Sequence, residues 1–220
     1  MVLLFLCIKA DLDGVRGTVI IPYDVQSTLR IHWFLQSLDL YPQFKHIIHS
    51  SLSFVHDSLL CLDVRNPISE FEVREKIVLE TTQYLESEEE EMNHNSMTRE
   101  PPGHFALRWE GNKRRGVMEV LDIDQVKLLL KKKNKLHEVP RDKLTEDDSG
   151  SFVPVLALEC RGLKPYAFHP RGGEFVVVST GGFRFPIGAI DLSSGDWTDY
   201  DEENGTPVSV TNFEAKFIVP

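Results

Sequence analysis

Short runs of alternating apolar and polar residues, separated by Gly, Pro and Asp, constrain the fold of this chain more than any other feature. In residues 71–79, four apolar side chains share one parity, and only Glu75 interrupts the apolar face that a strand would have here. Similar runs occupy residues 105–107, 117–121, 153–160, 175–179 and 208–219. Because turn-forming residues bound most of these runs, the pattern predicts an all-β or β-dominated, mostly antiparallel fold.

Helical signals are few. Residues 122–137 form the best candidate, with an apolar stripe made by Ile123, Val126, Leu129 and Leu130. Lysines 131 to 133 lie toward the C-terminal end of this segment, where positive charge complements the helix dipole. We therefore expect at most a few helices.

Polar stretches divide the chain. Residues 86–91 are an acidic run around Ser87, and residues 92–103 are polar with a Pro pair, so the two together predict a solvated loop. Residues 141–150 are interpreted as a linker. We expect an N-terminal lobe of residues 1–140 and a C-terminal β lobe of residues 151–220, arranged as a two-lobed antiparallel sheet or a partly open barrel.

Composition limits the classes of function. The chain has 24 Lys and Arg against 34 Asp and Glu, a net charge of −10, which makes nucleic acid an unfavoured partner. The opening MVLLFLCIKAD reaches Lys9 and Asp11 too early for a signal peptide or a membrane span, and it predicts a buried strand. The three cysteines are too few and too scattered for a disulfide framework. A reducing compartment, the cytoplasm or the nucleus, fits best, and Cys160 is predicted to be a buried thiol.

Three motifs in the C-terminal third carry a resemblance. They are Leu158-Glu-Cys-Arg-Gly-Leu-Lys-Pro165, Phe168-His-Pro-Arg-Gly172 and Ile190-Asp-Leu-Ser-Ser-Gly-Asp-Trp-Thr-Asp-Tyr-Asp-Glu202. Across residues 151–219 this pattern resembles the eukaryotic CxxC-motif zinc-binding protein family, and residues 4–15 resemble the family's first strand and turn. The resemblance implies a β architecture with a structural zinc ion.

The expected zinc ligands are absent from the segments that resemble the two family knuckles. Residues 71–80 align with the form Phe-x-Val-Lys-Cys-x-x-Cys-Arg-Glu, which places Glu75 and Val78 at cysteine positions. Residues 105–114 align with Phe-x-x-Lys-Cys-x-x-Cys-Lys-Arg, which places Trp109 and Asn112 at the other two. A structural zinc site needs four ligands such as thiolates in tetrahedral array, so this alignment predicts that the zinc has been lost.

Residues 36–66 have no counterpart that we can place in the family. His46 and His49 would share a helix face, but two further ligands are lacking, so we interpret both as ordinary histidines. The segment is either a helix that covers a face left bare by the missing zinc or translated intron sequence. We favour the second interpretation because the segment interrupts the family pattern where the first knuckle strand should begin.

Two hypotheses of function follow. The first is a non-enzymatic binding or scaffold protein whose protein partner contacts an exposed turn around Trp197, Asp199 and Tyr200. The second is a zinc-binding protein with substitute ligands, drawn from Cys61, His94, His104 and Cys160. No catalytic residue, cofactor, nucleic acid or membrane partner is predicted, and a pair of His169 with Asp199 would lack a nucleophile.

Overall fold

The computed structural model describes residues 1–15, 52–54, 59–69, 71–85, 102–132, 138–141, 143–186 and 188–220. Its strands are β1 (Val2–Asp13), β2 (Leu52–Phe54), β3 (Leu59–Arg65), β4 (Val73–Glu80), β5 (Phe105–Leu107), β6 (Gly116–Leu121), β7 (Lys143–Leu144), β8 (Val153–Arg161), β9 (Lys164–His169), β10 (Phe175–Val177), β11 (Trp197–Asp201) and β12 (Thr206–Ile218). Within these ranges there is one α-helix, α3 (Ile123–Lys132), and a 3-10 helix, η2 (Glu146–Asp148). The prediction of a β-dominated fold is confirmed.

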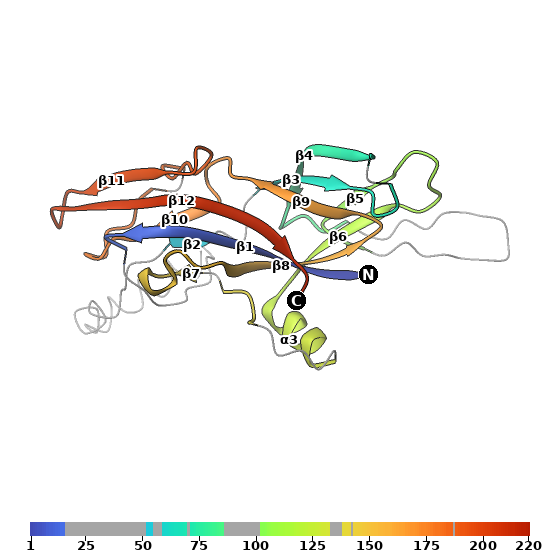
Figure 1. Cartoon of the computed structure of the whole chain (residues 1–220), viewed down its shortest axis with the longest axis horizontal. Helices are drawn as coiled ribbons and strands as arrows, with labels where there is room; N and C mark the ends of the chain where they lie inside the picture. Colours follow the sequence, from blue (N-terminus) through green and yellow to red (C-terminus); the bar gives the residue numbers. More distant parts are fainter. Residues whose placement is uncertain are drawn as a thin grey trace, which may run out of the picture.

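A curled six-stranded antiparallel sheet of order β11-β12-β1-β8-β6-β5 forms the body of the protein (Figure 1). Two three-stranded sheets, of orders β4-β3-β9 and β10-β2-β7, accompany it. Strand β1 pairs with both β8 and β12, and β3 pairs with both β4 and β9. Strands from residues 1–140 and 151–220 therefore share the same sheets, so the boundary expected near residues 141–151 does not divide the sheets.

Strand β1 is buried on both faces, which explains its nearly continuous apolar sequence. Alternate residues from Leu4 to Leu12 join the main core, which also contains Leu60 and Leu62 of β3. The residues of opposite parity, Leu3, Phe5 and Cys7, pack against Val126 and Leu130 of α3. Because successive side chains of a strand point to opposite faces, β3 and α3 lie on opposite sides of β1 (Figure 1). The buried strand predicted at the start of the chain is confirmed.

Helix α3 begins after a reciprocal cap. Asp122 Oδ1 accepts the Gln125 N–H at 2.7 Å, and Gln125 Oε1 accepts the Asp122 N–H at 2.9 Å. Val126 and Leu130 are buried as predicted, whereas Ile123 is 42% exposed. The apolar stripe of α3 is therefore narrower than the sequence indicated. Residues 133–137 of the predicted helix lie outside the described residues.

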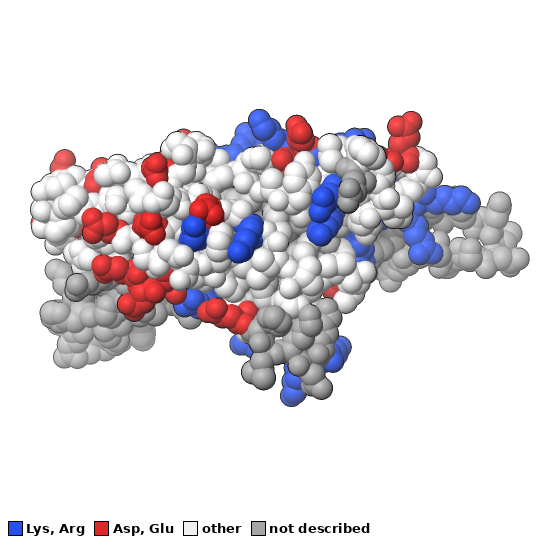
Figure 2. Space-filling model, in the orientation of Figure 1, with Lys and Arg blue, Asp and Glu red and all other residues white. Residues whose placement is uncertain are grey.

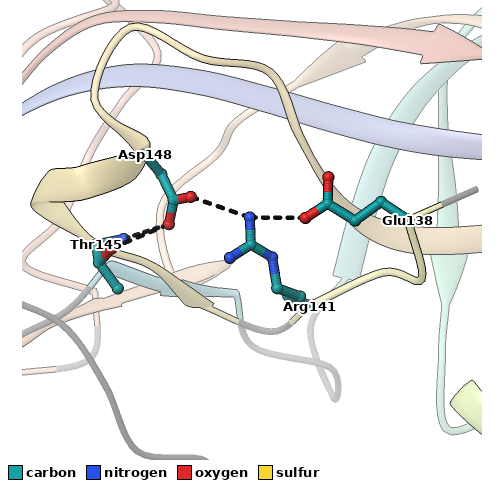
Figure 3. Close-up of polar contacts among 4 residues, drawn as sticks. All are labelled: Glu138, Arg141, Thr145 and Asp148. Carbon is teal, nitrogen blue, oxygen red and sulfur yellow. Dashed lines mark hydrogen bonds and ion pairs between the residues drawn. The ribbon is translucent and has the colours of Figure 1, made fainter.

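The segment interpreted as a linker contacts β1 and is held by polar contacts of its own. Arg141 lies 3.0 Å from both Glu138 Oε1 and Asp148 Oδ1, and Asp148 Oδ2 accepts the Thr145 N–H at 3.0 Å (Figure 3). The Gly150 N–H donates to the Ala10 carbonyl at 3.0 Å. These contacts satisfy the polar groups of the connection within the protein.

The C-terminal part of the predicted insert forms a β-strand. Residues 59–65 of the segment 36–66 form β3, the central strand of the β4-β3-β9 sheet. Five of its residues are buried: the apolar Leu60, Cys61, Leu62 and Val64, and the carboxylate Asp63. This part of the segment is therefore core, not an addition to the fold. Residues 36–50, including His46 and His49, lie outside the described residues.

The three cysteines are buried and unbridged. Burial raises the pKa of the Cys160 thiol to about 12 and that of the Cys7 thiol to about 11. Cys160 is thus the buried thiol that the sequence predicted.

In the part of the chain that the structure describes, α3 is too short and too polar to cross a membrane.

Candidate functional site

Residues 105–114, which resemble a family zinc knuckle, contain a tight turn between β5 and β6. Leu107 of β5 pairs with Gly116 of β6, and inside this pair the Asn112 N–H donates to the Trp109 carbonyl at 3.1 Å. Gly111 has φ of +75°, a conformation that favours glycine. The backbone therefore forms a four-residue turn whose first and last positions are Trp109 and Asn112, the spacing of a CxxC pair.

Trp109 anchors this turn to the rest of the fold. Its side chain is 2% exposed, and its indole Nε1–H donates to the Gly162 carbonyl at 2.8 Å. Gly162 lies between β8 and β9, and a Cβ added at Gly116 would come within 2.8 Å of the same carbonyl oxygen. The absence of a side chain at Gly116 therefore allows β6 to approach the connection that Trp109 contacts.

Arg74 joins the turn to β4. Its guanidinium carbon lies 5.7 Å from the centroid of the Trp109 ring, and its Nη1 donates to the Val73 carbonyl. A guanidinium over an indole face is attracted by the ring quadrupole. The indole of Trp109 therefore connects three parts of the protein: the β5–β6 turn, β4 and the β8–β9 connection.

The other segment that resembles a family knuckle, residues 71–80, does not form a turn at its two cysteine positions. Glu75 and Val78 lie within strand β4, and both are exposed, Val78 to 42%. A CxxC knuckle places its two ligands in one turn, whereas two residues three apart in a strand point to opposite faces. Glu75 and Val78, which the alignment places at cysteine positions, therefore do not lie in a turn of this kind.

The connection between β3 and β4 contains a pair with the spacing of a CxxC motif, Asn66 and Ser69. The Asn66 N–H donates to the Glu72 carbonyl at 2.9 Å, and the Glu72 N–H donates to the Ser69 carbonyl at 3.2 Å. The preceding residues, Leu62-Asp-Val-Arg65, fit the pattern apolar-x-Val-basic as well as Phe71-Glu-Val-Arg74 does. The sequence alignment used the second Val-Arg pair, Val73-Arg74. In the structure, a turn follows the first pair, Val64-Arg65.

The four side chains in these turns do not fit a structural zinc site. Asn66, Ser69, Trp109 and Asn112 include no thiolate, imidazole or carboxylate. Asn66 is 4% exposed, with Oδ1 accepting the Ile68 N–H at 3.0 Å and Nδ2 donating to Glu72 Oε2 at 2.7 Å. Its polar atoms therefore stabilise the turn itself.

Three of the four alternative ligands, Cys61, His104 and Cys160, lie in the described residues, and these three do not form a metal-binding group. Cys61 is in β3 and Cys160 is in β8, while His104 Nδ1 accepts the Val120 N–H at 3.0 Å. Burial lowers the pKa of His104. His94 lies outside the described residues. Within the described ranges, no group of three or more His, Cys, Asp or Glu side chains is placed to hold a metal ion.

His169 pairs with Asp63, not with Asp199. The His169 Nε2 lies 2.8 Å from Asp63 Oδ2, and Asp63 Oδ1 accepts the Lys76 N–H at 2.7 Å. Lys76 has φ of +52°, and the pairing of β3 with both of its neighbours is irregular at Asp63. Burial alone would raise the pKa of Asp63, but the Lys76 hydrogen bond and His169 hold it below its usual value. This carboxylate links the three strands of its sheet, a structural role that sequence spacing did not reveal.

In the contact surface predicted around Trp197, Asp199 and Tyr200 are exposed but Trp197 is buried. Trp197 is 9% exposed, lies in β11, packs edge-on against Phe185 with ring centroids 5.0 Å apart, and donates its indole N–H to the Ala189 carbonyl. Asp199 and Tyr200 in the same strand are exposed, Tyr200 to 52%. The expectation of an exposed tryptophan turn is wrong because the motif is a strand whose tryptophan faces the core.

Known proteins match about a third of this chain at 33–42% sequence identity. The fruit fly (Drosophila melanogaster) protein UPF0587 protein CG4646 is 42% identical over 74 residues, which are 34% of this chain and 44% of that protein. The human CXXC motif containing zinc binding protein is 33% identical over 72 residues, 33% of this chain and 44% of the human protein. These matches span less than half the length of the curated relatives.

Two solved structures have the same fold over nearly the whole chain. A hypothetical protein from Plasmodium falciparum has a TM-score of 0.62 at 18% identity, covering 99% of this chain and 100% of that one. The crystal structure of C1orf123 has a TM-score of 0.63 at 17% identity, covering 99% of each chain.

The sequence profile of one family matches most of the chain. It covers residues 52–218, so it includes β3 and the end of the segment that we interpreted as an insert without a family counterpart. That interpretation is corrected for residues 52–66. The chain belongs to the eukaryotic family of CXXC motif containing zinc binding proteins.

Proposed function

We propose that this chain is a non-enzymatic binding or scaffold protein that keeps the architecture of its family without the structural zinc ion. The observation that carries the proposal is the Trp109–Asn112 turn, in which an indole is buried at a position where a thiolate would be expected. The turn at Asn66 and Ser69 supports it, because Asn66 has intramolecular partners for its side chain.

Packing of Trp109 contributes less free energy to the folded state than a structural zinc ion would. Structural zinc supplies about 10–16 kcal/mol of apparent binding free energy in finger peptides. Burial of a large apolar side chain contributes about 1.5–3 kcal/mol, and a cation–π contact at an exposed site about 0.5–1 kcal/mol. Sheet pairing of β3 with β9 and of β6 with β8 must therefore hold much of this end of the protein.

Metal content and thermal stability test the proposal directly. We expect purified full-length chain, expressed with added zinc, to contain well under one zinc ion per chain, and its melting temperature to be unchanged by zinc or by a chelator. A ligand stabilises only the state that it binds, so a chelator has no effect where no metal is bound. One zinc ion per chain, or a lower melting temperature with chelator, would instead support substitute ligands among Cys61, His94, His104 and Cys160.

A restored site provides the positive control. The variant with Asn66→Cys, Ser69→Cys, Trp109→Cys and Asn112→Cys should bind one zinc ion, because it places two cysteine pairs in the two observed turns. A matched variant with Glu75→Cys, Val78→Cys, Trp109→Cys and Asn112→Cys should not, because its first pair lies in a strand. Zinc binding by the second variant alone would mean that the turns are assigned incorrectly.

The compartment and the kind of partner are part of the same proposal. Three unbridged buried cysteines are compatible with the cytoplasm or the nucleus. A protein partner is favoured over nucleic acid because the net charge of the chain is −10.

A further inference from the structure

The β3–β4 turn presents the most exposed large apolar side chains of the described residues. Phe71 is 97% exposed and Ile68 is 89% exposed, and Pro67 beside them is also exposed. The turn is held by the backbone bonds of Asn66 with Glu72 and by the side chain of Asn66. These side chains are therefore displayed on a fixed turn, where they do not contribute to the core.

Basic side chains flank this turn. Arg65 precedes it and stacks on Tyr166 at 5.8 Å, and Arg74 follows it and stacks on Trp109 at 5.7 Å. The Arg74–Trp109 contact brings the β5–β6 turn alongside, and that turn carries exposed Lys113 and Arg114. We call residues 65–69, 71–74 and 109–114 the knuckle tip. The acidic side chains within these ranges are Glu72, which is bound to Asn66, and Glu110. Glu70 lies between Ile68 and Phe71 in the sequence, outside the described residues.

The opposite end of the protein is acidic. Exposed carboxylates lie on and around β11, at Asp191, Asp196, Asp199, Glu202 and Glu203. Figure 2 shows Asp and Glu gathered over the end with β11 and β12, and Lys and Arg predominating toward the other end. On the face drawn in Figure 2, the charges of the described residues are thus unevenly distributed, and the exposed apolar turn lies toward the end where Lys and Arg predominate. The acidic run of residues 86–91 lies outside the described residues.

We propose that the knuckle tip binds an acidic segment of another protein, with apolar side chains of that segment packing on Ile68 and Phe71. Charge complementarity selects the partner. The knuckle tip carries four cationic side chains against two carboxylates, one of them bound to Asn66, so an acidic segment is attracted more than a basic one. Nucleic acid is disfavoured because Glu110 and the net charge of −10 oppose phosphate, although the exposed ring of Phe71 could stack on a base. The inference rests on the proposed binding role and not on the absence of zinc.

Fluorescence anisotropy of the full-length chain with labelled peptides tests this interaction. The probe is a short Glu-rich peptide with Leu and Phe at every third or fourth position, and its control replaces each Glu with Lys. We expect the acidic peptide to bind, with affinity falling as salt rises, and the basic peptide not to bind. The double variant Ile68→Ser with Phe71→Ser should weaken binding about tenfold or more, as loss of central apolar anchors does.

Three further variants locate the site. Lys113→Glu with Arg114→Glu should weaken binding and reduce its salt dependence, and both residues are exposed in a turn, so folding is retained. Leu128→Ser on α3, which is 61% exposed, removes a comparable apolar side chain elsewhere and should leave binding unchanged. Tyr200→Ser should also leave it unchanged. Thermal melts of each variant verify that it is folded.

Several outcomes would overturn the proposal. They are no binding of the acidic peptide, equal binding of the basic peptide, and undiminished binding by the Ile68 and Phe71 variant. Loss of binding in Tyr200→Ser would place the surface on β11 instead. Tighter binding of single-stranded RNA, or dimerisation in sedimentation that the Ile68 and Phe71 variant abolishes, would assign the tip to a different occupant. None of these results depends on zinc content, which the metal analysis measures separately.

Discussion

At the scale of single residues, Trp109 has the largest predicted effect on stability. Its ring is buried, and its indole N–H is bonded to the Gly162 carbonyl. Trp109→Ala should lower the free energy of unfolding by about 3–5 kcal/mol through cavity formation. Trp109→Phe should cost about 1–3 kcal/mol, because the ring remains but the carbonyl loses its donor. Urea unfolding measures both, and a Trp109→Ala effect as small as that of exposed Phe71→Ala would contradict the assignment.

Asp63 gives the stability of the protein a pH dependence. Because its pKa is lower in the folded chain than in the unfolded chain, its contribution is fully present above the unfolded pKa, about 3.9. The contribution is lost as pH falls through the lower folded pKa. We expect Asp63→Asn to reduce the loss of stability on acidification below about pH 4. Urea midpoints measured from neutral to acid pH check this, and an unchanged acid slope would exclude Asp63 as the responsible group.

At the scale of elements, the hairpins that carry the knuckle turns are peripheral. Strands β4 and β5 are edge strands of their sheets, whereas β1 and β8 are flanked on both sides. In β4 only Leu79 is buried, whereas eight of the nine residues of β8 are. Local opening is easiest where few apolar contacts must be broken. Within residues 1–140, the free energy of local opening should therefore be lowest in the edge strands β4 and β5.

Amide hydrogen exchange should be faster in the edge strands than in the central strands. We expect β4 and β5 to exchange well before β1, β8 and the part of β12 that pairs with β1. This refines the expectation of a less stable N-terminal lobe, because β1 belongs to that range but lies in the middle of the large sheet. Mass spectrometry of peptic peptides provides the measurement. Protection of β4 equal to that of β1 would indicate an additional constraint, such as a bound metal ion, on the hairpins.

At the scale of the whole molecule, the two sequence ranges depend on each other. Strand β1 lies between β8 and β12, so residues 151–220 alone would lack the strand that joins their two longest strands. We expect a fragment of residues 151–220 to show no cooperative thermal transition by circular dichroism, while the full chain shows one. A sharp transition of the isolated fragment would support the predicted independent C-terminal lobe.

The sequence alone determined the strands with clear apolar patterns, the helix and the buried start of the chain, because each is encoded by the spacing of apolar residues along a local segment. It also determined that the knuckle turn at Trp109 and Asn112 lacks cysteines. Only the tertiary structure decided that Asn66 and Ser69 occupy the other turn, since Val64-Arg65 and Val73-Arg74 are locally equivalent. It also decided that Trp197 faces the core, that Asp63 contacts His169, and that residues 59–65 form a central strand. The physical reason is that periodicity fixes which residues share a face, whereas the partner of that face depends on pairing between strands that are distant in sequence.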